Sequence, residues 1–400
     1  MMRQPSRFAA LLLLSTLLSA CYVAPGSPNY KPPTGSGPTI APTTAPSAAI
    51  YMAYVLSAAS NSVIAYSLNP ATGTLTQVGR SRHAAGSRRP NSTAFALPSG
   101  CNPTYLTVSG YQMFVLCNST PPYLVALTIA SDGSISGTQT PTATLDTGAS
   151  NMKSAYVGNA NIGQVTIIAV ANNVMPEIQL VTSSGDGLST PAKYGLRTYA
   201  GAMALSLASS SVLQVYVALY DLASGDVVSG PTDNISGFQV SPALQFQGFV
   251  NALTAGSYDT NTLLYGAGAN VNVLGVANSS GMVTFTAFPN PYTLTAPGPA
   301  HDNLITFSAD PVSPVLAIAA SSGLSIYDVS GNAKSETTLP NPPVAISSMD
   351  TPSGVYVGVL DASNLTLYSI APTTYSITPY SPQPGSGTSA LFLAALNQSM

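Results

Sequence analysis

The residues best suited to acid–base chemistry are His301 and Asp302, which stand together in the segment PAHDNLITFS. General acid–base catalysis needs groups that titrate near the working pH and converge in space, and the chain has only two His. The pair is therefore the best catalytic candidate, and the alternative is a pair that caps a loop or closes a turn. Of the two Glu, Glu177 is expected at the solvated start of a strand and Glu336 on an outer strand at the surface.

A second chemical feature is the basic segment RSRHAAGSRRP at residues 80–90. Its cationic and imidazole side chains are those of Arg80, Arg82, His83, Arg88 and Arg89. Guanidinium groups bind phosphate and carboxylate groups through paired hydrogen bonds. The segment predicts a patch that binds a small anionic ligand or docks an envelope protein, and the alternative is a solvated insertion loop.

The first of the three cysteines ends an export signal. Two Arg precede the apolar run FAALLLLSTLLSA, which is too short for a stable membrane span. The run ends in LSAC, which resembles the lipobox of bacterial lipoproteins, so Cys21 is expected to carry the lipid. Two or three acyl chains on one residue suffice for stable anchoring to a membrane. By the same resemblance, Tyr22 after the Cys favours the outer membrane.

The residues after Cys21 are rich in Pro, Thr, Ser and Gly, and they read as an extended tether. The expected organisation is a signal peptide at 1–20, a lipidated tether at 21–48 and a folded domain at 49–400. The alternative at the N-terminus is an ordinary cleaved signal peptide with an incidental Cys.

Cys101 and Cys117 flank the segment PTYLTVSGYQMFVLC, which reads as a hairpin with its turn near residues 109–112. Strand pairing would match Cys117 with a residue near 104, so Cys101 needs a bend to reach it. Exported proteins occupy compartments where disulfides form. A disulfide and two buried free thiols remain the two alternatives here.

The composition excludes several kinds of site and partner. Two of the eleven Lys and Arg lie in the signal peptide, so nine remain against fourteen Asp and Glu, a formal charge near −5. This balance favours neither nucleic acid nor a strongly anionic surface as a partner. No metal site or cofactor is expected, because the chain has only two His, no closely spaced Cys pair and no Gly-rich phosphate loop before a helix. Asp221, Asp226 and Asp233 lack the spacing of a calcium loop and read as turn residues.

Short apolar or alternating runs recur in sets of four between Gly, Pro, Asn, Asp and Ser turns, so the domain is expected to be all-β. First strands are expected from residues 104, 153, 202, 251, 303 and 344, a spacing of 41 to 52 residues. Sets of four strands at this period are typical of β-propeller blades.

The two ends of the domain predict how the ring closes. The sequence begins at YMAYVLS as a second strand with no first strand before it, and one unpaired apolar run, residues 389–396, remains at the other end. This run is expected to be the inner strand of the first blade, which makes seven blades closed by both termini. The alternative is a C-terminal helix, because Leu and Ala have good helix propensity.

The segments YVLSAASNSVIAYSLNPATGTLTQVG and NPTYLTVSGYQMFVLCNS resemble the seven-bladed lactonase-type β-propellers, a family that includes the propeller 6-phosphogluconolactonases. The resemblance implies a catalytic cluster of His, Glu and Arg at the central channel. The matching positions do not carry these residues: the third blade has NMKSAYVG without the expected His, and the fourth has Ala202, Met203 and at best Asp221.

The sequence therefore predicts a lipid-anchored propeller that acts as a binding or assembly module at the cell envelope. A divergent lactonase-like hydrolase is the alternative. Acidic, basic and His side chains that converge at the channel would favour the hydrolase, whereas a channel of Ser, Thr and Ala would favour the binding module.

Overall fold

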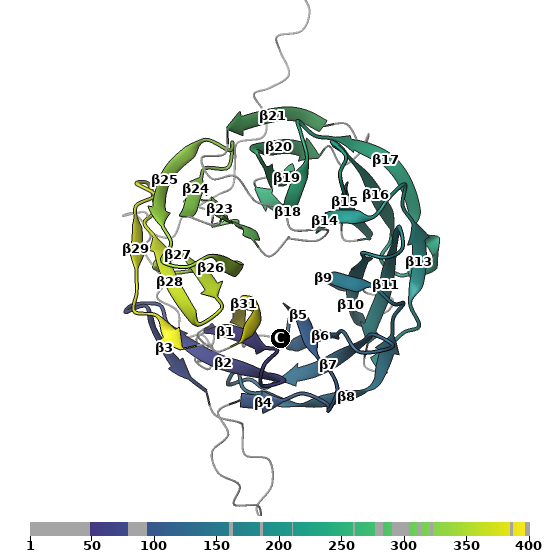
Figure 1. Cartoon of the computed structure of the whole chain (residues 1–400), viewed down its shortest axis with the longest axis horizontal. Coiled ribbons are helices and arrows are strands. Elements are labelled where there is room, and N and C mark those ends of the chain that lie inside the picture. The colour runs from purple at the N-terminus through teal and green to yellow at the C-terminus, as the bar shows by residue number, and fades with distance from the viewer. Residues whose placement is uncertain are drawn as a thin grey trace, which may run out of the picture. The chain divides into compact units, whose positions relative to one another are not determined.

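Short alternating segments of the chain form strands that assemble into seven antiparallel sheets around one axis (Figure 1). The computed structural model describes residues 49–78, 94–159, 163–184, 187–209, 211–258, 261–276, 283–289, 304–310, 314–320, 323–384 and 387–396. Each sheet is one blade of a β-propeller, and the prediction of an all-β, seven-bladed fold is confirmed.

The first three strands of every blade run antiparallel to one another from the axis outward. The inner strands, from the first blade to the seventh, are β31 (Thr388–Leu396), β5 (Pro103–Ser109), β9 (Ala149–Asn159), β14 (Ala200–Ser209), β18 (Val250–Tyr258), β22 (Ile305–Ser308) and β26 (Pro343–Thr351). The second strands are β1 (Ile50–Ser57), β6 (Gln112–Cys117), β10 (Gly163–Asn172), β15 (Val212–Leu219), β19 (Asn261–Gly268), β23 (Val315–Ala320) and β27 (Gly354–Asp361). The third strands are β2 (Ser62–Asn69), β7 (Tyr123–Ile129), β11 (Glu177–Ser184), β16 (Ser224–Pro231), β20 (Asn270–Val276), β24 (Gly323–Tyr327) and β28 (Asn364–Ile370).

The outer strands differ more between blades, and in three blades two short strands share the edge. They are β3 (Thr74–Gln77) and β4 (Ala94–Ala96), β8 (Ile135–Thr144), β12 (Gly187–Leu188) and β13 (Ala192–Gly195), β17 (Gln239–Gln245), β21 (Val283–Pro289), β25 (Ala333–Thr338), and β29 (Ile377–Pro379) with β30 (Gln383–Pro384). The helical element in the described residues is the 3₁₀ turn η1 (Ile235–Gly237). None of these residues forms a helix long and apolar enough to cross a membrane.

The ring closes where the two ends of the chain meet. Strand β31 pairs antiparallel with β1, with Ile50 opposite Leu396 and Val55 opposite Leu391. The purple and yellow ends of the chain lie side by side in Figure 1. The prediction that residues 389–396 supply the missing inner strand is confirmed, and the alternative helix is wrong, because the run completes a sheet whose apolar faces would otherwise stay exposed.

Apolar side chains fill the spaces between neighbouring blades. Between the first two blades, Met52 and Leu56 of β1 pack in one cluster with Met113 and Val115 of β6, and all four are buried. Both faces of a blade are covered only when other blades flank it, so the core exists only in the closed ring.

A tyrosine in the second strand ties several blades to the next one. Tyr54 Oη donates to Gly133 O at 2.8 Å, Tyr265 Oη to Val329 O at 2.9 Å and Tyr356 Oη to Pro70 O at 2.8 Å. In each case the acceptor lies in the turn between the third and fourth strands of the following blade. The shared pattern shows that the first blade, built from both chain ends, is oriented like the fifth and the seventh.

Candidate functional site

The residues predicted to bind anions or carry catalysis lie outside the described part of the chain. Arg80, Arg82, His83, Arg88 and Arg89 precede β4, and the pair His301 and Asp302 precedes β22. The lipidation residue Cys21 also lies outside this part. The basic patch, the catalytic pair and the lipid anchor therefore stay predictions.

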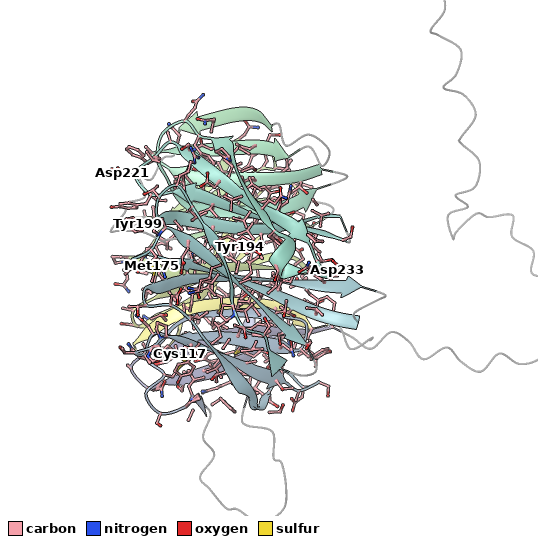
Figure 2. The ribbon with its side chains drawn as sticks, turned by 90° about the vertical axis from the view of Figure 1, so that its right-hand side faces the viewer. Cys117, Met175, Tyr194, Tyr199, Asp221 and Asp233 are labelled. Carbon is pink, nitrogen blue, oxygen red and sulfur yellow. A yellow bond between two sulfur atoms is a disulfide. The ribbon has the colours of Figure 1, made fainter. Side chains whose placement is uncertain are left out.

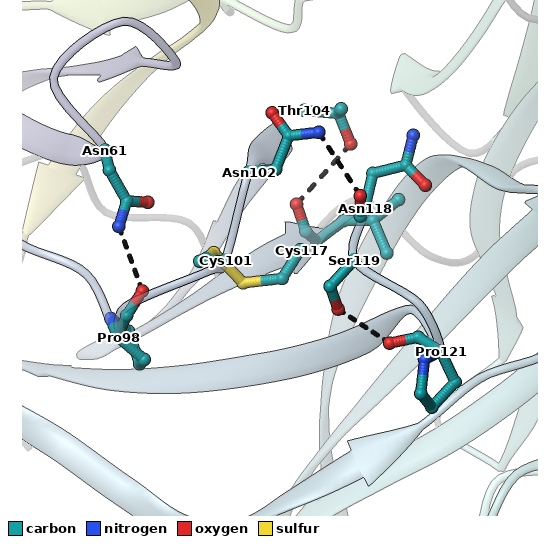
Figure 3. The surroundings of a disulfide bond; sticks show 10 residues. Asn61, Pro98, Cys101, Asn102, Thr104, Cys117, Asn118, Ser119 and Pro121 are labelled. Carbon is teal, nitrogen blue, oxygen red and sulfur yellow. Dashed lines mark hydrogen bonds between the residues drawn. A yellow bond between two sulfur atoms is a disulfide. The ribbon is translucent and has the colours of Figure 1, made fainter.

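Cys101 and Cys117 form a disulfide, and both are fully buried (Figure 3). Cys117 pairs with Pro103 at the start of β5, so Cys101 lies beyond the ladder. A bend reaches it, because Asn102 has a φ of 46° and its side-chain amide donates to Asn118 O at 3.2 Å. The disulfide thus fixes the loop that leads into the second blade.

The inner strands around the axis are linked mainly by hydroxyl groups. Thr107 of β5 and Ser154 of β9 are 2.8 Å apart through their side-chain oxygens, and Thr306 of β22 and Ser348 of β26 are 2.7 Å apart. In the fourth blade, Ala202 and Met203 are buried in the blade interfaces. The structure thus links neighbouring inner strands through hydroxyl groups, whereas Ala202 and Met203 lie in the interfaces between blades.

Two charged residues occur in the described inner strands, Lys153 of β9 and Asp350 of β26. Ser308 Oγ donates a hydrogen bond to Asp350 Oδ1, and Asp310 lies close by. Local burial of the carboxyl group and the negative charge of Asp310 raise the pKa of Asp350 to about 6. Among the described residues, no three His, Cys, Asp or Glu side chains gather as a metal site would require.

A different surface stands out by its exposed apolar side chains. Eight large apolar side chains of the described residues are exposed, and Val174 and Phe249 are the most exposed, each at 56%. Six of the total of eight lie on segments that meet at one face of the propeller, and we call this set the apolar arc. Its members are Val174, Met175, Tyr199, Tyr220, Leu222 and Phe249. Figure 2 shows Met175, Tyr199 and Asp221 along one edge of the molecule and Asp233 on the opposite edge.

The strand order explains why these residues share a face. Tyr199 and Phe249 immediately precede the inner strands β14 and β18, whereas Met175 and Leu222 lie in turns between second and third strands. In an antiparallel blade, the start of the first strand and the end of the second lie at the same edge. Accordingly, the backbone N–H of Tyr220 donates to Tyr199 O at 2.8 Å.

A buried asparagine holds the part of the arc that belongs to the third blade. Asn172 is 1% exposed, and its Oδ1 accepts hydrogen bonds from the N–H groups of Val174 at 2.8 Å and Met175 at 2.9 Å. Its Nδ2 donates to Thr147 O at 3.0 Å, in the loop before the inner strand. The two apolar residues are therefore presented on a fixed turn.

In the next two blades, buried polar side chains of the third strand hold the loops that precede the inner strands. Asp226 of β16 accepts from Arg197 N at 3.1 Å, and Asn272 of β20 accepts from Gln247 N at 2.9 Å. Asp226 also pairs with the Arg197 guanidinium at 2.7 Å. Both acceptors are completely buried. In each loop the residue two positions later is the exposed aromatic side chain of the arc, Tyr199 or Phe249.

In the third blade, a glycine takes the place of the exposed aromatic residue. Gln179 Oε1 accepts from Asp146 N at 3.3 Å, and the residue two positions later is Gly148 with a φ of 97°. A Cβ at Gly148 would lie 2.7 Å from Cβ of Val174. Val174 thus occupies the space of the side chain that Gly148 lacks, and the apolar surface continues into this blade.

The seventh blade shows that the fold does not require apolar residues at these positions. Asp361 Oδ1 accepts from Ser363 N at 2.6 Å and Asn364 N at 2.7 Å, which repeats the turn that Asn172 holds. The positions that match Val174 and Met175 are therefore Ser363 and Asn364, and both are polar. The same turn geometry carries polar side chains in one blade and large apolar ones in another.

No direct signal for the arc is present in the sequence. Tyr199 and Phe249 lie 50 positions apart, and the residues around them do not distinguish them from apolar residues of the core. The hydrogen-bonded position two residues earlier, Arg197 in one blade and Gln247 in the next, recurs between blades. Only the folded structure shows this correspondence.

Comparison with known proteins identifies the fold but no sequence family. No family model matches the chain, and no curated protein matches it. Among solved structures, a proposed 6-phosphogluconolactonase from Bacteroides uniformis has a TM-score of 0.62 at 13% identity, covering 86% of this chain and 99% of its own. A protein from Lactobacillus plantarum has a TM-score of 0.58 at 15% identity, with the same coverage.

AztD from Citrobacter koseri also superposes, with a TM-score of 0.51 at 11% identity over 87% of this chain and 98% of its own. At these identities the likeness is one of fold, and function has to be argued from the residues of this chain. The chain thus has the architecture of the seven-bladed lactonase-type propellers.

Proposed function

We propose that the chain is an exported, lipid-anchored propeller that acts as a binding module at the cell envelope, with the apolar arc as its protein-binding surface. The observation that carries the proposal is the gathering of six large exposed apolar side chains at one face of three consecutive blades. Contiguous exposed apolar patches on soluble domains commonly mark interaction sites.

The rigidity of the arc supports binding. Asn172, Asp226 and Asn272 use buried hydrogen-bonding groups to hold the loops that carry it. Side chains that are already ordered lose less conformational entropy when a partner docks. Aromatic residues such as Tyr199 and Phe249 are also enriched at protein interfaces.

The buried disulfide supports the exported location. Disulfides persist in oxidising compartments and are rare in the reducing cytosol. Labelling the protein with a radioactive fatty acid in the producing bacterium tests the anchor directly. We expect label on the wild type and none on Cys21→Ser, and label that persists on Cys21→Ser would contradict lipidation at this residue.

Affinity capture from detergent-solubilised envelopes tests the binding function. The full-length tagged chain, the variants Phe249→Ser and Tyr199→Ser, and the control Val240→Ser are compared. Val240 is an exposed apolar residue on the outer strand β17, outside the arc. Each captured protein is then purified and its affinity for the four chains is measured.

The expected result is a partner whose affinity falls by about tenfold or more for the arc variants and stays unchanged for Val240→Ser. A partner that binds all four chains equally would contradict the assignment of the arc. If no captured protein binds the chain again after purification, the binding function is contradicted.

A further inference from the structure

We infer that the partner segment bound by the apolar arc combines apolar side chains with a Lys or Arg, and that Asp221 pairs with this cation. The inference rests on the proposed function, since it assumes that the arc binds a protein. It specifies the chemistry of that protein from one acidic residue, Asp221, that stands between two members of the arc, Tyr220 and Leu222.

The turn between β15 and β16 fixes the position of Asp221. Its φ of 59° lies in the left-handed region, which Asp and Asn adopt more readily than most residues. Backbone hydrogen bonds hold both neighbours, from Tyr220 N to Tyr199 O at 2.8 Å and from Leu222 N to Leu219 O at 3.3 Å. The exposed carboxylate is thus carried on a rigid turn among the apolar side chains.

Basic side chains of strand β13 and of the loop before β14 are already paired within the chain. Lys193 Nζ lies 2.5 Å from Asp146 Oδ2, and Arg197 Nε lies 2.7 Å from Asp226 Oδ1. Within the part of the chain that the structure describes, no ion pair involves Asp221. Its charge is therefore available to a cation brought by the partner.

The charge of the described residues as a whole points the same way. The described residues include eleven Asp and Glu against four Lys and Arg, and Lys193, Arg197 and Lys334 are in ion pairs. An excess of carboxylates attracts a cationic partner and repels an anionic lipid surface. A basic protein segment is therefore favoured over an anionic bilayer.

The start of strand β1 lies at the face of the propeller away from the arc. Ile50 at the start of β1 pairs with Leu396 at the end of the inner strand β31. The arc lies at the opposite face, where the inner strands begin.

Two fluorescein-labelled peptides test the inference on the purified full-length chain. They share the same Leu, Phe and Gly residues and differ only in carrying Lys or Glu between them, and binding is measured by fluorescence anisotropy. The variants are Phe249→Ser for the arc and Asp221→Asn for the charge, because Asn tolerates the left-handed backbone. The controls are Val240→Ser and Asp233→Asn, an exposed acid on the opposite face.

We expect the Lys peptide to bind the wild type about three- to fivefold more tightly than the Glu peptide in about 0.05 M NaCl, as one exposed ion pair would give. Asp221→Asn should remove this difference, about 0.5 M NaCl should reduce it, and both controls should retain it. Phe249→Ser should weaken both peptides.

Several results would overturn the inference. If Asp221→Asn leaves the ratio between the peptides unchanged, or Asp233→Asn changes it equally, Asp221 does not select a cation. In that case loss of both peptides in Phe249→Ser would still support the arc as a binding surface. If neither peptide binds, the partner is not an apolar basic segment.

Two further arms separate other occupants. If the chain binds phosphatidylcholine vesicles, with or without phosphatidylglycerol, and Phe249→Ser removes this binding, the arc is assigned to a bilayer. Self-association of the chain in sedimentation that Phe249→Ser removes would assign it to a second copy. Either result, without a preference for the Lys peptide, would overturn the proposed partner.

Discussion

Asp350 lies near the end of the inner strand β26, and its carboxyl group accepts a hydrogen bond from Ser308. Local desolvation and the nearby charge of Asp310 raise its pKa to about 6, above the ordinary value of 3.8. The folded chain therefore binds this proton more tightly than the unfolded chain. The contribution of Asp350 to stability falls as pH rises from about 4 to about 6.

Asp350→Asn should accordingly become more stable relative to wild type as pH rises through this window. The difference in the free energy of unfolding should be constant above about pH 6, and solvent around this exposed residue keeps it small. Urea titrations between pH 3.5 and 8 measure it. Asp310→Asn should shift the midpoint of the change to lower pH, and an unchanged midpoint would contradict the role given to Asp310.

Tyr265 illustrates how one hydroxyl links two blades. Its ring is fully buried, and its Oη donates to Val329 O of the next blade at 2.9 Å. Burial of the hydroxyl also raises the pKa of Tyr265. We expect Tyr265→Phe to lower the free energy of unfolding by about 1 kcal/mol, because the carbonyl loses its partner. Chemical denaturation measures this, with exposed Tyr199→Phe as a control that should be nearly neutral.

At the scale of elements, the loops before the inner strands depend on buried polar side chains of the third strand. Asn272 accepts from Gln247 N and donates toward Asn270 O at 3.3 Å. We expect Asn272→Ala to destabilise the chain by about 2 kcal/mol, because buried backbone groups lose their partners. The variant should also weaken partner binding, because Phe249 follows this loop. Hydrogen exchange at residues 246–249 measures the loosening, and unchanged protection would contradict the anchoring role.

The disulfide is a second constraint on an element. It closes a loop of 16 residues between the loop before β5 and the end of β6. The chain-entropy model assigns about 3 kcal/mol to a loop of this length. Replacing Cys101 and Cys117 together by Ser should lower the free energy of unfolding by about this amount in urea titrations. Wild type unfolded with a reductant should match the double variant, and a clear mismatch would point to damage caused by the serines.

At the scale of the whole molecule, stability depends on closure of the ring. Strand β31 places Leu391 and Leu393 in the core between the first and seventh blades. The backbone N–H of Leu393 also donates to Ser347 Oγ of β26 at 2.9 Å. The last strand therefore joins the first blade to the seventh.

We expect Leu393→Ala to cost about 3 kcal/mol, in the range for buried Leu, and Leu222→Ala in the exposed arc to cost much less. A chain that ends at Gly387 should lose cooperative thermal unfolding. A synthetic peptide of residues 388–400 should restore it by occupying the vacant position. Cooperative unfolding of the truncated chain alone, followed by circular dichroism, would contradict closure by this strand.

The sequence alone predicted most of the architecture. Alternation with four strands in every 41 to 52 residues specified the blades, because one strand periodicity repeats along the chain. The unpaired run at 389–396 specified the closure, because a blade without its inner strand leaves apolar faces uncovered. The choice between a disulfide and two free thiols could not be made from the sequence, since the disulfide depends on a bend at Asn102 that strand patterning does not describe.

The tertiary structure decided which isolated residues act together. Tyr199 and Phe249 read as ordinary apolar residues in the sequence, where apolar side chains are expected in the core. Only the packed blades place them outside, because Asp226 and Asn272, buried in strands distant along the chain, hold their loops at one face. Asp310 and Asp350 likewise meet only because two inner strands are neighbours in the ring. Local pattern therefore determined the blades, and long-range contacts determined the surface that they present.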